Sequence, residues 1–276
     1  MTSQDFQIIA DFVKREAGIV LGADKTYLVD SRLGSVAGRF GFADVAALAR
    51  GLLPGPPGLK LAVIDAMTTN ESFFFRDTTP FQHFEQVILP ALAVARKTTG
   101  RIRIWSAACS TGQEPYSLAM QLLERKSLWQ GLQVEIVGTD LSPSALNRAR
   151  EGRYSQFEVQ RGLPIQLLVK YFRQEGTSWI ISDEIKRMVR FQEGNLLAPM
   201  TGMGLVDVIF CRNVLIYFDV ATKTDILDRM AKVLRPDGYL ILGAAETMMG
   251  VSRRFGPTGQ HRGLYQPVTA GEKLSA

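Results

Sequence analysis

The residues whose types and spacing best suit chemistry lie in Ile104–Ser117. There an apolar segment runs into a loop of small side chains and then into a helical segment with Pro115 in its first turn. Small residues let a ligand approach the backbone closely. Asp140 stands at the end of the next apolar segment, where an acid can hydrogen-bond the two ribose hydroxyls of an adenosine ligand. The pattern indicates an adenosine-cofactor site, with a tight β–α turn beside a solvated acid as the alternative.

The loop also restricts the kind of cofactor. It lacks the G-x-G-x-x-G sequence that cradles a pyrophosphate, so a dinucleotide is disfavoured. A cofactor without phosphates, such as S-adenosyl-L-methionine, fits better.

Composition excludes several other classes of site. The chain of 276 residues has a net charge of +5, and no stretch approaches the roughly 18 apolar residues that a membrane span needs. Two cysteines, Cys109 and Cys211, cannot form a disulfide framework and fit a reduced cytosol. The two histidines, His83 and His261, belong to no cluster with metal-ligand spacing, so we expect no metal site and no histidine-based hydrolase.

The elements that must position these residues differ between the two halves of the chain. From about residue 100, apolar segments alternate with helical ones, which argues for a parallel sheet with helices on both faces. Ligands bind such sheets at the carboxyl ends of the strands. Pro236-Asp237-Gly238 is a turn signal before the last strand. The expected strands are Ile102–Ser106, Val134–Thr139, Val189–Gln192, Val206–Cys211 and Tyr239–Leu242.

Residues 1–69 predict only helices, four in number, which bury one another as a small domain. Thr2 and Asp5 form a capping-box pattern at the first. The second, Tyr27–Phe40, turns an apolar face inward and carries Arg32 and Arg39 on a neighbouring polar stripe. We expect both arginines to be free at the surface.

Residues 152–188 interrupt the alternation. Trp179–Ile181 has the pattern of a strand, and Gln174–Thr177 has that of a hairpin turn. We expect a small antiparallel excursion attached to the main sheet.

Five segments, in chain order, resemble the chemotaxis receptor methyltransferases of the CheR type. The segments are Thr69–Asp77 (TNESFFFRD), Ala108–Ser117 (ACSTGQEPYS), Gly138–Ser142 (GTDLS), Asn195–Leu197 (NLL) and Phe210–Phe218 (FCRNVLIYF). The resemblance spans nearly the whole chain. Two mild departures are Gln113, where the family usually has glutamate, and Ser72, where threonine is common.

The resemblance implies a Rossmann-like α/β methyltransferase fold with three parts. These are a helical domain at 1–69, a linker at 70–90 that contributes to the cofactor site, and a methyltransferase domain at 91–276 with a β-subdomain at about 152–188. It implies S-adenosyl-L-methionine as cofactor and S-adenosyl-L-homocysteine as product. By motif position, the implied cofactor-binding residues are Asn70, Ser72, Arg76, Glu114, Asp140, Asn195, Leu196, Arg212 and Asn213.

The implied acceptors are glutamate side chains on the cytoplasmic helical bundle of methyl-accepting chemotaxis proteins. A glutamate is ionised at neutral pH, so no general base is required and the task is one of positioning. Arg76 and Tyr217 are the expected catalytic residues, with a surface salt bridge from Arg76 to Asp77 or Glu71 and simple packing of Tyr217 as the alternatives. Arg76 or Arg212 would orient carboxylates, and Arg32 and Arg39 would dock the acidic bundle.

The sequence also suggests partners and location. We expect a cytoplasmic monomer that binds no nucleic acid and is not embedded in a membrane, since no basic stripe with interleaved aromatics is present. A receptor C-terminal peptide is a possible further ligand of the 152–188 excursion. The competing functions are methyl transfer to another protein or a small molecule, and a non-catalytic module that senses S-adenosyl-L-methionine.

Overall fold

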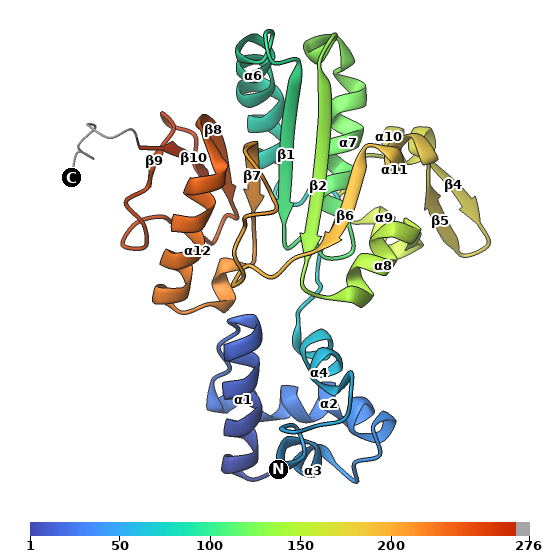
Figure 1. The fold of residues 1–276 in the computed structure, drawn as a ribbon. Coiled ribbons are helices and arrows are strands. Elements are labelled where there is room, and N and C mark those ends of the chain that lie inside the picture. Colours follow the sequence, from blue (N-terminus) through green and yellow to red (C-terminus); the bar gives the residue numbers. More distant parts are fainter. Residues whose placement is uncertain (269–276) are drawn as a thin grey trace.

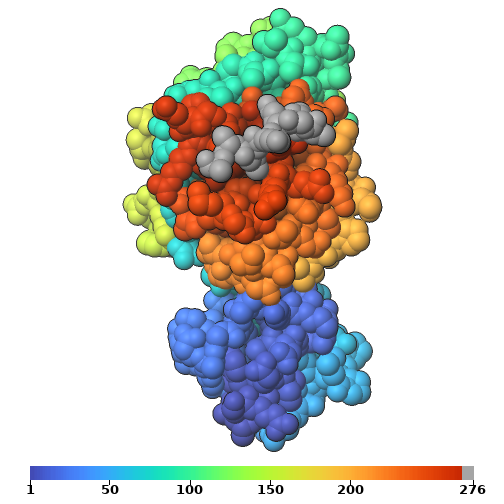
Figure 2. All heavy atoms as spheres, turned by 90° about the vertical axis from the view of Figure 1, so that its left-hand side faces the viewer, coloured from blue at the N-terminus to red at the C-terminus, as the bar shows by residue number. Residues whose placement is uncertain are grey.

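The computed structural model describes residues 1–268 and divides into two lobes. Figure 1 shows a small helical domain placed against one end of a larger α/β domain. The central strands β1 (Arg101–Ala107), β2 (Gln133–Asp140) and β6 (Val189–Glu193) terminate at that end. Figure 2 shows the narrow waist between the two lobes. The domain bounds expected from the sequence, 1–69, 70–90 and 91–276, stay a prediction, and residues 269–276 of the last domain lie outside the described part.

The helical lobe consists of α1 (Ser3–Ala17), η1 (Ala23–Lys25), α2 (Thr26–Arg39), α3 (Val45–Arg50) and α4 (Leu59–Met67). The predicted capping box at Thr2 and Asp5 is present at the start of α1. Apolar side chains of the four α-helices form one buried cluster, with Ile9, Leu33, Leu48 and Val63 fully inside. These contacts confirm the expected all-helical domain.

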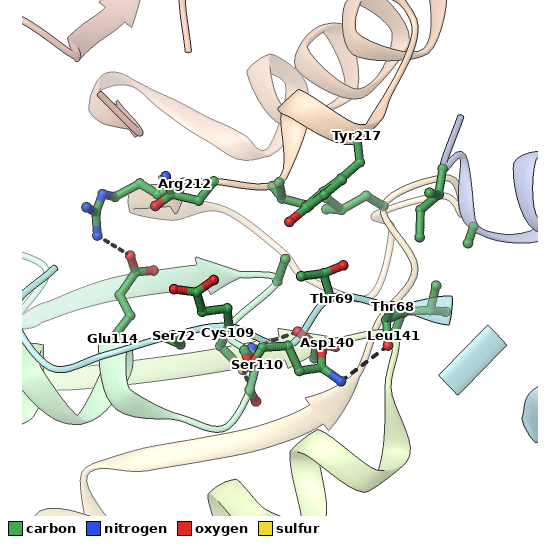
Figure 3. Close-up of a pocket in the computed structure, with 18 of the residues that line it drawn as sticks. Thr68, Thr69, Ser72, Cys109, Ser110, Glu114, Asp140, Leu141, Arg212 and Tyr217 are labelled. Atoms are coloured by element: carbon green, nitrogen blue, oxygen red, sulfur yellow. Dashed lines mark hydrogen bonds and ion pairs between the residues drawn. The ribbon is translucent and has the colours of Figure 1, made fainter. Parts of the chain in front are cut away.

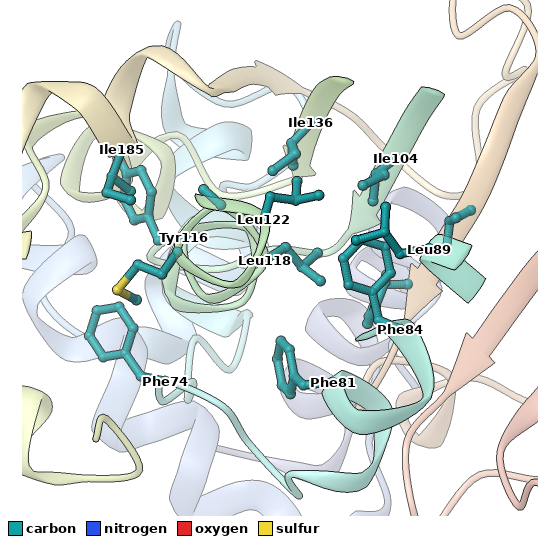
Figure 4. Close-up of a cluster of buried hydrophobic side chains, with 14 of the residues drawn as sticks. Phe74, Phe81, Phe84, Leu89, Ile104, Tyr116, Leu118, Leu122, Ile136 and Ile185 are labelled. Carbon is teal, nitrogen blue, oxygen red and sulfur yellow. The ribbon is translucent and has the colours of Figure 1, made fainter. Parts of the chain in front are cut away.

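The linker continues into a long irregular helical segment along the main sheet. It comprises α5 (Thr79–His83), the π-turn η2 (Phe84–Ile88) and α6 (Leu89–Ala95). Phe81, Phe84 and Leu89 of this segment pack around α7 (Gln113–Glu124) with Phe74 of the linker (Figure 4). The linker is thus anchored in the core of the α/β domain.

The main sheet has the order β6-β2-β1-β7-β8-β10-β9. The parallel strands are β1 (Arg101–Ala107), β2 (Gln133–Asp140), β6 (Val189–Glu193), β7 (Val206–Cys211) and β8 (Leu234–Leu242). The helices α7 (Gln113–Glu124), α8 (Pro143–Glu151) and α12 (Val220–Val233), with the short turn η3 (Lys126–Trp129), connect them. The strand order reverses between β1 and β7, where a parallel sheet opens a ligand crevice.

The last part of the sheet differs from the expectation. Pro236-Asp237-Gly238 does not form the predicted turn before the last strand. Strand β8 starts at Leu234 and includes these three residues, and its pairing with β7 shifts register there, as at a β-bulge. Gly238 is required there, since a Cβ would lie 2.8 Å from the carbonyl oxygen of Asp207. Two short strands, β9 (Phe255–Pro257) and β10 (Leu264–Pro267), extend the edge in antiparallel fashion and were not predicted.

The excursion at 152–188 is a separate three-stranded antiparallel sheet, as expected. Its strands β3 (Arg153–Ser155), β5 (Ser178–Ile181) and β4 (Phe172–Glu175) pair in that order. The short helices α9 (Gln156–Gln160), α10 (Ile165–Tyr171) and α11 (Asp183–Arg187) flank them. Tyr154 and Phe172 contact Phe74 edge to face, so this sheet shares the core that holds the linker.

Among the helices of residues 1–268, none combines the length and the apolar character that crossing a membrane demands.

Candidate functional site

A cavity opens where the strand order of the main sheet reverses. Its sheet wall is built from the loops after β1, β2, β6 and β7, and its other wall from the linker and the end of α1 (Figure 3). Asn70, Ser72, Arg76, Glu114, Asp140, Asn195, Leu196, Arg212, Asn213 and Tyr217 all line it. The structure therefore gathers in one cavity every residue expected to bind cofactor or act in catalysis.

The loop after β1 is shaped to leave its backbone open to the cavity. Ala108, Ser110 and Gly112 all have a positive φ angle, which residues other than glycine rarely adopt. A Cβ on Gly112 would lie 2.9 Å from the Cβ of Ala149, so the close contact of this loop with α8 requires glycine. The small residues noted in the sequence thus shape the cavity floor.

Asp140, the last residue of β2, holds the loop after β1 by hydrogen bonds. Its carboxylate accepts hydrogen bonds from the backbone N–H of Ser110 at 2.7 Å and of Ser142 at 2.9 Å. Burial raises the pKa of Asp140, and these N–H groups act in the opposite direction by stabilising the anion. The acid holds two loops together while still facing the cavity.

Arg212 and Glu114 form a buried ion pair at the point where β1 and β7 separate (Figure 3). The guanidinium donates to Glu114 Oε2 at 2.7 Å, to the carbonyl oxygen of Arg76 at 2.7 Å and to Asp77 Oδ2 at 2.9 Å. The other oxygen of Glu114 accepts from the Ser106 hydroxyl at 2.7 Å. With its side chain 1% exposed, Arg212 fixes the linker to the sheet, and only its Nε lacks a partner among residues 1–268. It is not free to bind a carboxylate bidentately.

Arg76 is the available guanidinium. It is half-buried, lies over the ring of Phe73 and donates one long hydrogen bond, 3.3 Å, to the carbonyl oxygen of Glu71. The alternative of a surface ion pair with Asp77 is not what the structure shows, since Asp77 pairs with Arg212. The remaining donors of Arg76 are therefore available to a ligand.

Tyr217 lies across the cavity from the β1 loop. It is half-buried, on the one-turn helix η4 (Leu215–Tyr217), and its ring projects toward the linker (Figure 3). Its neighbours Leu215 and Phe218 are buried in the core behind it. Tyr217 is thus presented on an anchored turn.

The linker and the helical lobe complete the site through polar contacts. Asn70 donates to the Ser142 hydroxyl at 3.2 Å, and its carbonyl oxygen accepts from Ser110 at 3.0 Å. Asn195 donates to the carbonyl oxygen of Glu16 at 2.8 Å, which ties the sheet domain to the end of α1. Ser72 lines the cavity beside them.

The expectation that both arginines of α2 are free is wrong for Arg32. Its guanidinium donates to the carbonyl oxygens of Met67 at 2.8 Å and Thr68 at 2.9 Å, and to the Thr69 hydroxyl at 3.1 Å. These acceptors lie where α4 ends and its last carbonyl groups lack helical partners, so a cation there satisfies them. Arg39 is exposed and lies over the ring of Phe40. Neither arginine lines the cavity.

Sequence reasoning missed several residues that shape the site. Ala17, Ile19 and Thr68 line the cavity from the helical lobe. Asp65 accepts hydrogen bonds from Ser142 and Ser144, and Glu246 accepts four backbone N–H groups around the turn after β7. None of these follows from a local pattern, because each contact joins segments far apart in the chain.

The remaining candidates for chemistry, the two histidines and the two cysteines, are poorly suited to act on a ligand. His83 and His261 contact each other edge to face, with ring centroids 4.9 Å apart, and neither lines the cavity. Burial raises the pKa of both cysteine thiols, which disfavours the reactive thiolate. Cys109 faces the cavity and Cys211 lies behind it. Residues 1–268 contain no cluster of three or more side chains that could hold a metal ion.

The fold and cavity define an α/β protein with a ligand crevice at the carboxyl ends of its parallel strands, and comparison with known proteins assigns the chain to a methyltransferase family. Residues 70–264 match the family described as the CheR methyltransferase SAM-binding domain, and residues 4–68 match the CheR methyltransferase all-alpha domain. The chain belongs to the CheR methyltransferase family, and its cofactor is S-adenosyl-L-methionine.

Curated relatives agree over most of both chains. The chain is 44% identical over 248 residues to chemotaxis protein methyltransferase 1 of Pseudomonas aeruginosa, covering 88% of this chain and 90% of the relative. It is 40% identical to chemotaxis protein methyltransferase Cher2 of Pseudomonas putida, covering 91% of this chain and 93% of the relative. It is 34% identical to the chemotaxis protein methyltransferase of Borreliella burgdorferi, covering 91% of this chain and 90% of the relative. The similarity thus includes the helical lobe, the linker and the sheet domain together.

The residues present fit this cofactor. The cavity offers a buried acid at Asp140 near an exposed loop backbone, and a guanidinium at Arg76 with unused donors. Arg212 Nε is a buried donor without a partner in the described part of the chain, and its residue lines the same space. These groups provide for the hydroxyls and the charged amino-acid end of such a ligand.

Proposed function

We propose that this methyltransferase esterifies glutamate side chains of methyl-accepting chemotaxis receptors, producing glutamate methyl esters and S-adenosyl-L-homocysteine during chemotactic adaptation. The observation that carries the proposal is the presence in the cofactor cavity of two half-buried polar side chains, Arg76 with unused donors and Tyr217, that can hold an acceptor carboxylate. The names of the relatives, all chemotaxis protein methyltransferases, support the same acceptor.

The chemistry needs no base because of the acceptor itself. A glutamate carboxylate, whose ordinary pKa is about 4.3, is already anionic at neutral pH. When bound, S-adenosyl-L-methionine supplies the electrophilic methyl group. The chain's own contribution is to align the acceptor oxygen with that methyl and to exclude water, which is a positioning task.

We propose that the sheet wall and linker hold the cofactor. Asp140 would take the ribose hydroxyls, and Glu114 and Arg76 the amino-acid end. The rigid Arg212 pair would form the back of this compartment. Asn195 and Leu196 would flank the adenine, with Asn70, Ser72 and Asn213 completing the contacts.

Arg76 and Tyr217 would act on the open side of the cavity. The unused N–H donors of Arg76 can orient a carboxylate, with a bidentate geometry giving the strongest bond. The Tyr217 hydroxyl can hold the acceptor by a hydrogen bond from the opposite side. Tyr217→Phe should therefore lower turnover more than cofactor affinity, and a loss of stability alone would favour the packing alternative.

The receptor's acidic helical bundle would approach along the helical lobe. Arg39, which is exposed, suits long-range attraction, whereas Arg32 is already engaged with the linker. We propose that the protein acts as a cytoplasmic monomer. We propose that a receptor C-terminal peptide would bind to the small sheet at 152–188. A binding assay with peptides from receptor C-termini tests this point.

Incubation with a methyl-labelled cofactor and a receptor cytoplasmic fragment tests the function. The proposal predicts label on the receptor that mild base releases as methanol, because methyl esters hydrolyse in base. Base-stable label, or label on a small molecule or nucleic acid only, would indicate another acceptor. Cofactor binding without any transfer would indicate a sensing module.

A further inference from the structure

The turn after β7 is organised around the carboxylate of Glu246. The backbone N–H groups of Asn213, Val214 and Leu215 donate to it at 2.8, 3.0 and 2.8 Å. The N–H of Gly243, at the end of β8, donates to the same carboxylate at 2.7 Å. One side chain therefore joins the ends of two neighbouring strands.

The backbone at this turn has the form of an anion-binding concavity. Asn213 has a φ of 58° and Val214 a φ of −126°, so successive N–H groups point to one side. Alternation of left- and right-handed backbone makes the kind of nest that binds phosphates and other anions. Here the anion belongs to the chain itself.

The approach of Glu246 requires glycine at position 243. A Cβ there would lie 2.7 Å from Glu246 Oε2 and 3.0 Å from the Asn213 backbone nitrogen. A side chain would therefore displace either the carboxylate or the turn. Glycine at 243 therefore leaves room for the carboxylate to lie between the turn and the end of β8.

The turn leads directly into the residue that faces the acceptor. Leu215 begins η4, and Tyr217 ends it at the cavity. Arg212, just before the turn, is held independently by Glu114 and Asp77. Loss of the Glu246 contacts would thus move the Tyr217 side of the cavity while leaving the Arg212 side in place.

We propose that Glu246 is a positioning residue for methyl transfer: it fills the backbone nest at 213–215 and thereby fixes Tyr217 against the acceptor. Glu246 itself does not line the cavity, and we expect it to act mainly on turnover, with a smaller effect on cofactor affinity through Asn213. The inference rests on the proposed function in assigning the acceptor side of the cavity to Tyr217.

Glu246→Ala and Glu246→Gln test the proposal, with exposed Glu184→Ala as the matched control. Alanine should lower kcat about 100-fold, the effect expected of a misplacement near 1 Å. Affinity for S-adenosyl-L-homocysteine, measured by calorimetry, should fall much less, because Asn213 is the one cofactor-side residue on this turn. Glutamine should restore part of the rate, since its amide oxygen still accepts hydrogen bonds while its NH₂ group faces a donor. Glu184→Ala should behave as wild type.

A double-mutant cycle separates positioning from general structural damage. If Glu246 acts through Tyr217, Glu246→Ala combined with Tyr217→Phe should lose little more activity than the worse single variant. Fully additive losses would overturn the proposal. So would a loss of cofactor affinity that matches the loss of turnover.

A measurement without any acceptor keeps this test independent of the proposed function. The backbone N–H groups of Asn213, Val214 and Leu215 donate to Glu246, so their hydrogen–deuterium exchange, followed by mass spectrometry, should speed up in Glu246→Ala, while the amides of β1 serve as internal control. Unchanged exchange at 213–215 in this variant would overturn the positioning role. If wild type fails to label receptor glutamates, the proposed function fails, and the exchange result still decides the role of Glu246.

Discussion

The two walls of the cavity are built in different ways. On the sheet wall, Asp140, Glu114 and Arg212 are buried, and their charges are held by backbone N–H groups or by each other. The helical lobe meets the sheet domain through a few polar contacts near the surface. Examples are Lys14 with Asp219 at 2.9 Å and Val20 N–H with the Tyr217 carbonyl oxygen at 2.9 Å.

This difference implies different consequences of mutation. Removing one partner from a buried charged pair leaves the other uncompensated, which is costly. Removing a half-exposed contact costs little, because water replaces it. Substitutions on the sheet wall should therefore change cofactor binding strongly, and those on the helical lobe should act on receptor docking or on the linker.

The largest expected effect belongs to the sheet wall. Asp140→Ala should weaken S-adenosyl-L-homocysteine binding by about 1.5–3 kcal/mol, since a hydrogen bond to a charged group is lost. Calorimetry measures the affinity, circular dichroism checks the fold, and exposed Asp30→Ala serves as control. Unchanged affinity with an intact fold would remove Asp140 from the cofactor site.

The arginines of α2 sharpen the comparison within the helical lobe. Arg39→Glu should slow receptor methylation while cofactor affinity and thermal stability stay unchanged. The wild-type rate should fall with ionic strength, and the variant should respond less, because screening acts on exposed charges.

Arg32→Glu should behave differently, because Arg32 holds the end of α4 and the start of the linker. We expect a loss of stability on the order of 1–3 kcal/mol in thermal or denaturant unfolding. If Arg39→Glu methylates receptors normally at low salt, docking lies elsewhere, and the small sheet at 152–188 becomes the next surface to test. If Arg32→Glu is as stable as wild type, its contacts with the linker are not important.

The smallest expected effect is a pH dependence of folding stability that is caused by His83, which lies outside the cavity. Burial lowers the pKa of His83 from its usual 6.5, so the folded chain binds a proton there less readily than the unfolded chain. Stability should therefore fall as pH drops through 6.5 and level off below the folded pKa. Tm measured between about pH 5 and 7 should depend less on pH in His83→Gln.

His83 and His261 should take no part in catalysis. Changing His83 and His261 together to glutamine should leave the methyl-transfer rate nearly intact, with no rate limb near pH 6.5. A large rate loss with normal cofactor binding would show that the assignment of an already ionised nucleophile is wrong.

Local sequence patterns were sufficient for most of the fold. Helix caps, apolar periodicity and alternating segments located α1 to α4, the five parallel strands and the small sheet. They failed at Pro236–Gly238, where a strand partner absorbs a turn-like sequence as a bulge, and at the short strands β9 and β10. In each case pairing with a distant segment overrides the local signal.

The residues of the site also divide into those that local motifs predicted and those that only contacts with distant segments reveal. All the residues expected in the cavity line it. Asp140 follows from a strand-end pattern that the topology makes meaningful, whereas Asn70, Ser72 and Arg76 lie in the linker and were expected only from the family resemblance. Arg32 was misjudged because its partners lie on α4 and the linker. Glu246 was missed because an isolated glutamate carries no pattern, although the glycine three positions earlier is a feature that a close approach requires.

The most direct test of the account is to locate the transferred methyl group. Tandem mass spectrometry of a receptor cytoplasmic fragment, after incubation with wild-type protein and S-adenosyl-L-methionine, identifies the modified side chain. The account predicts one methyl group on individual glutamate carboxyls, lost on mild base treatment and strongly reduced with Asp140→Ala. Methylation of lysine, arginine or a thiol instead of glutamate would contradict it.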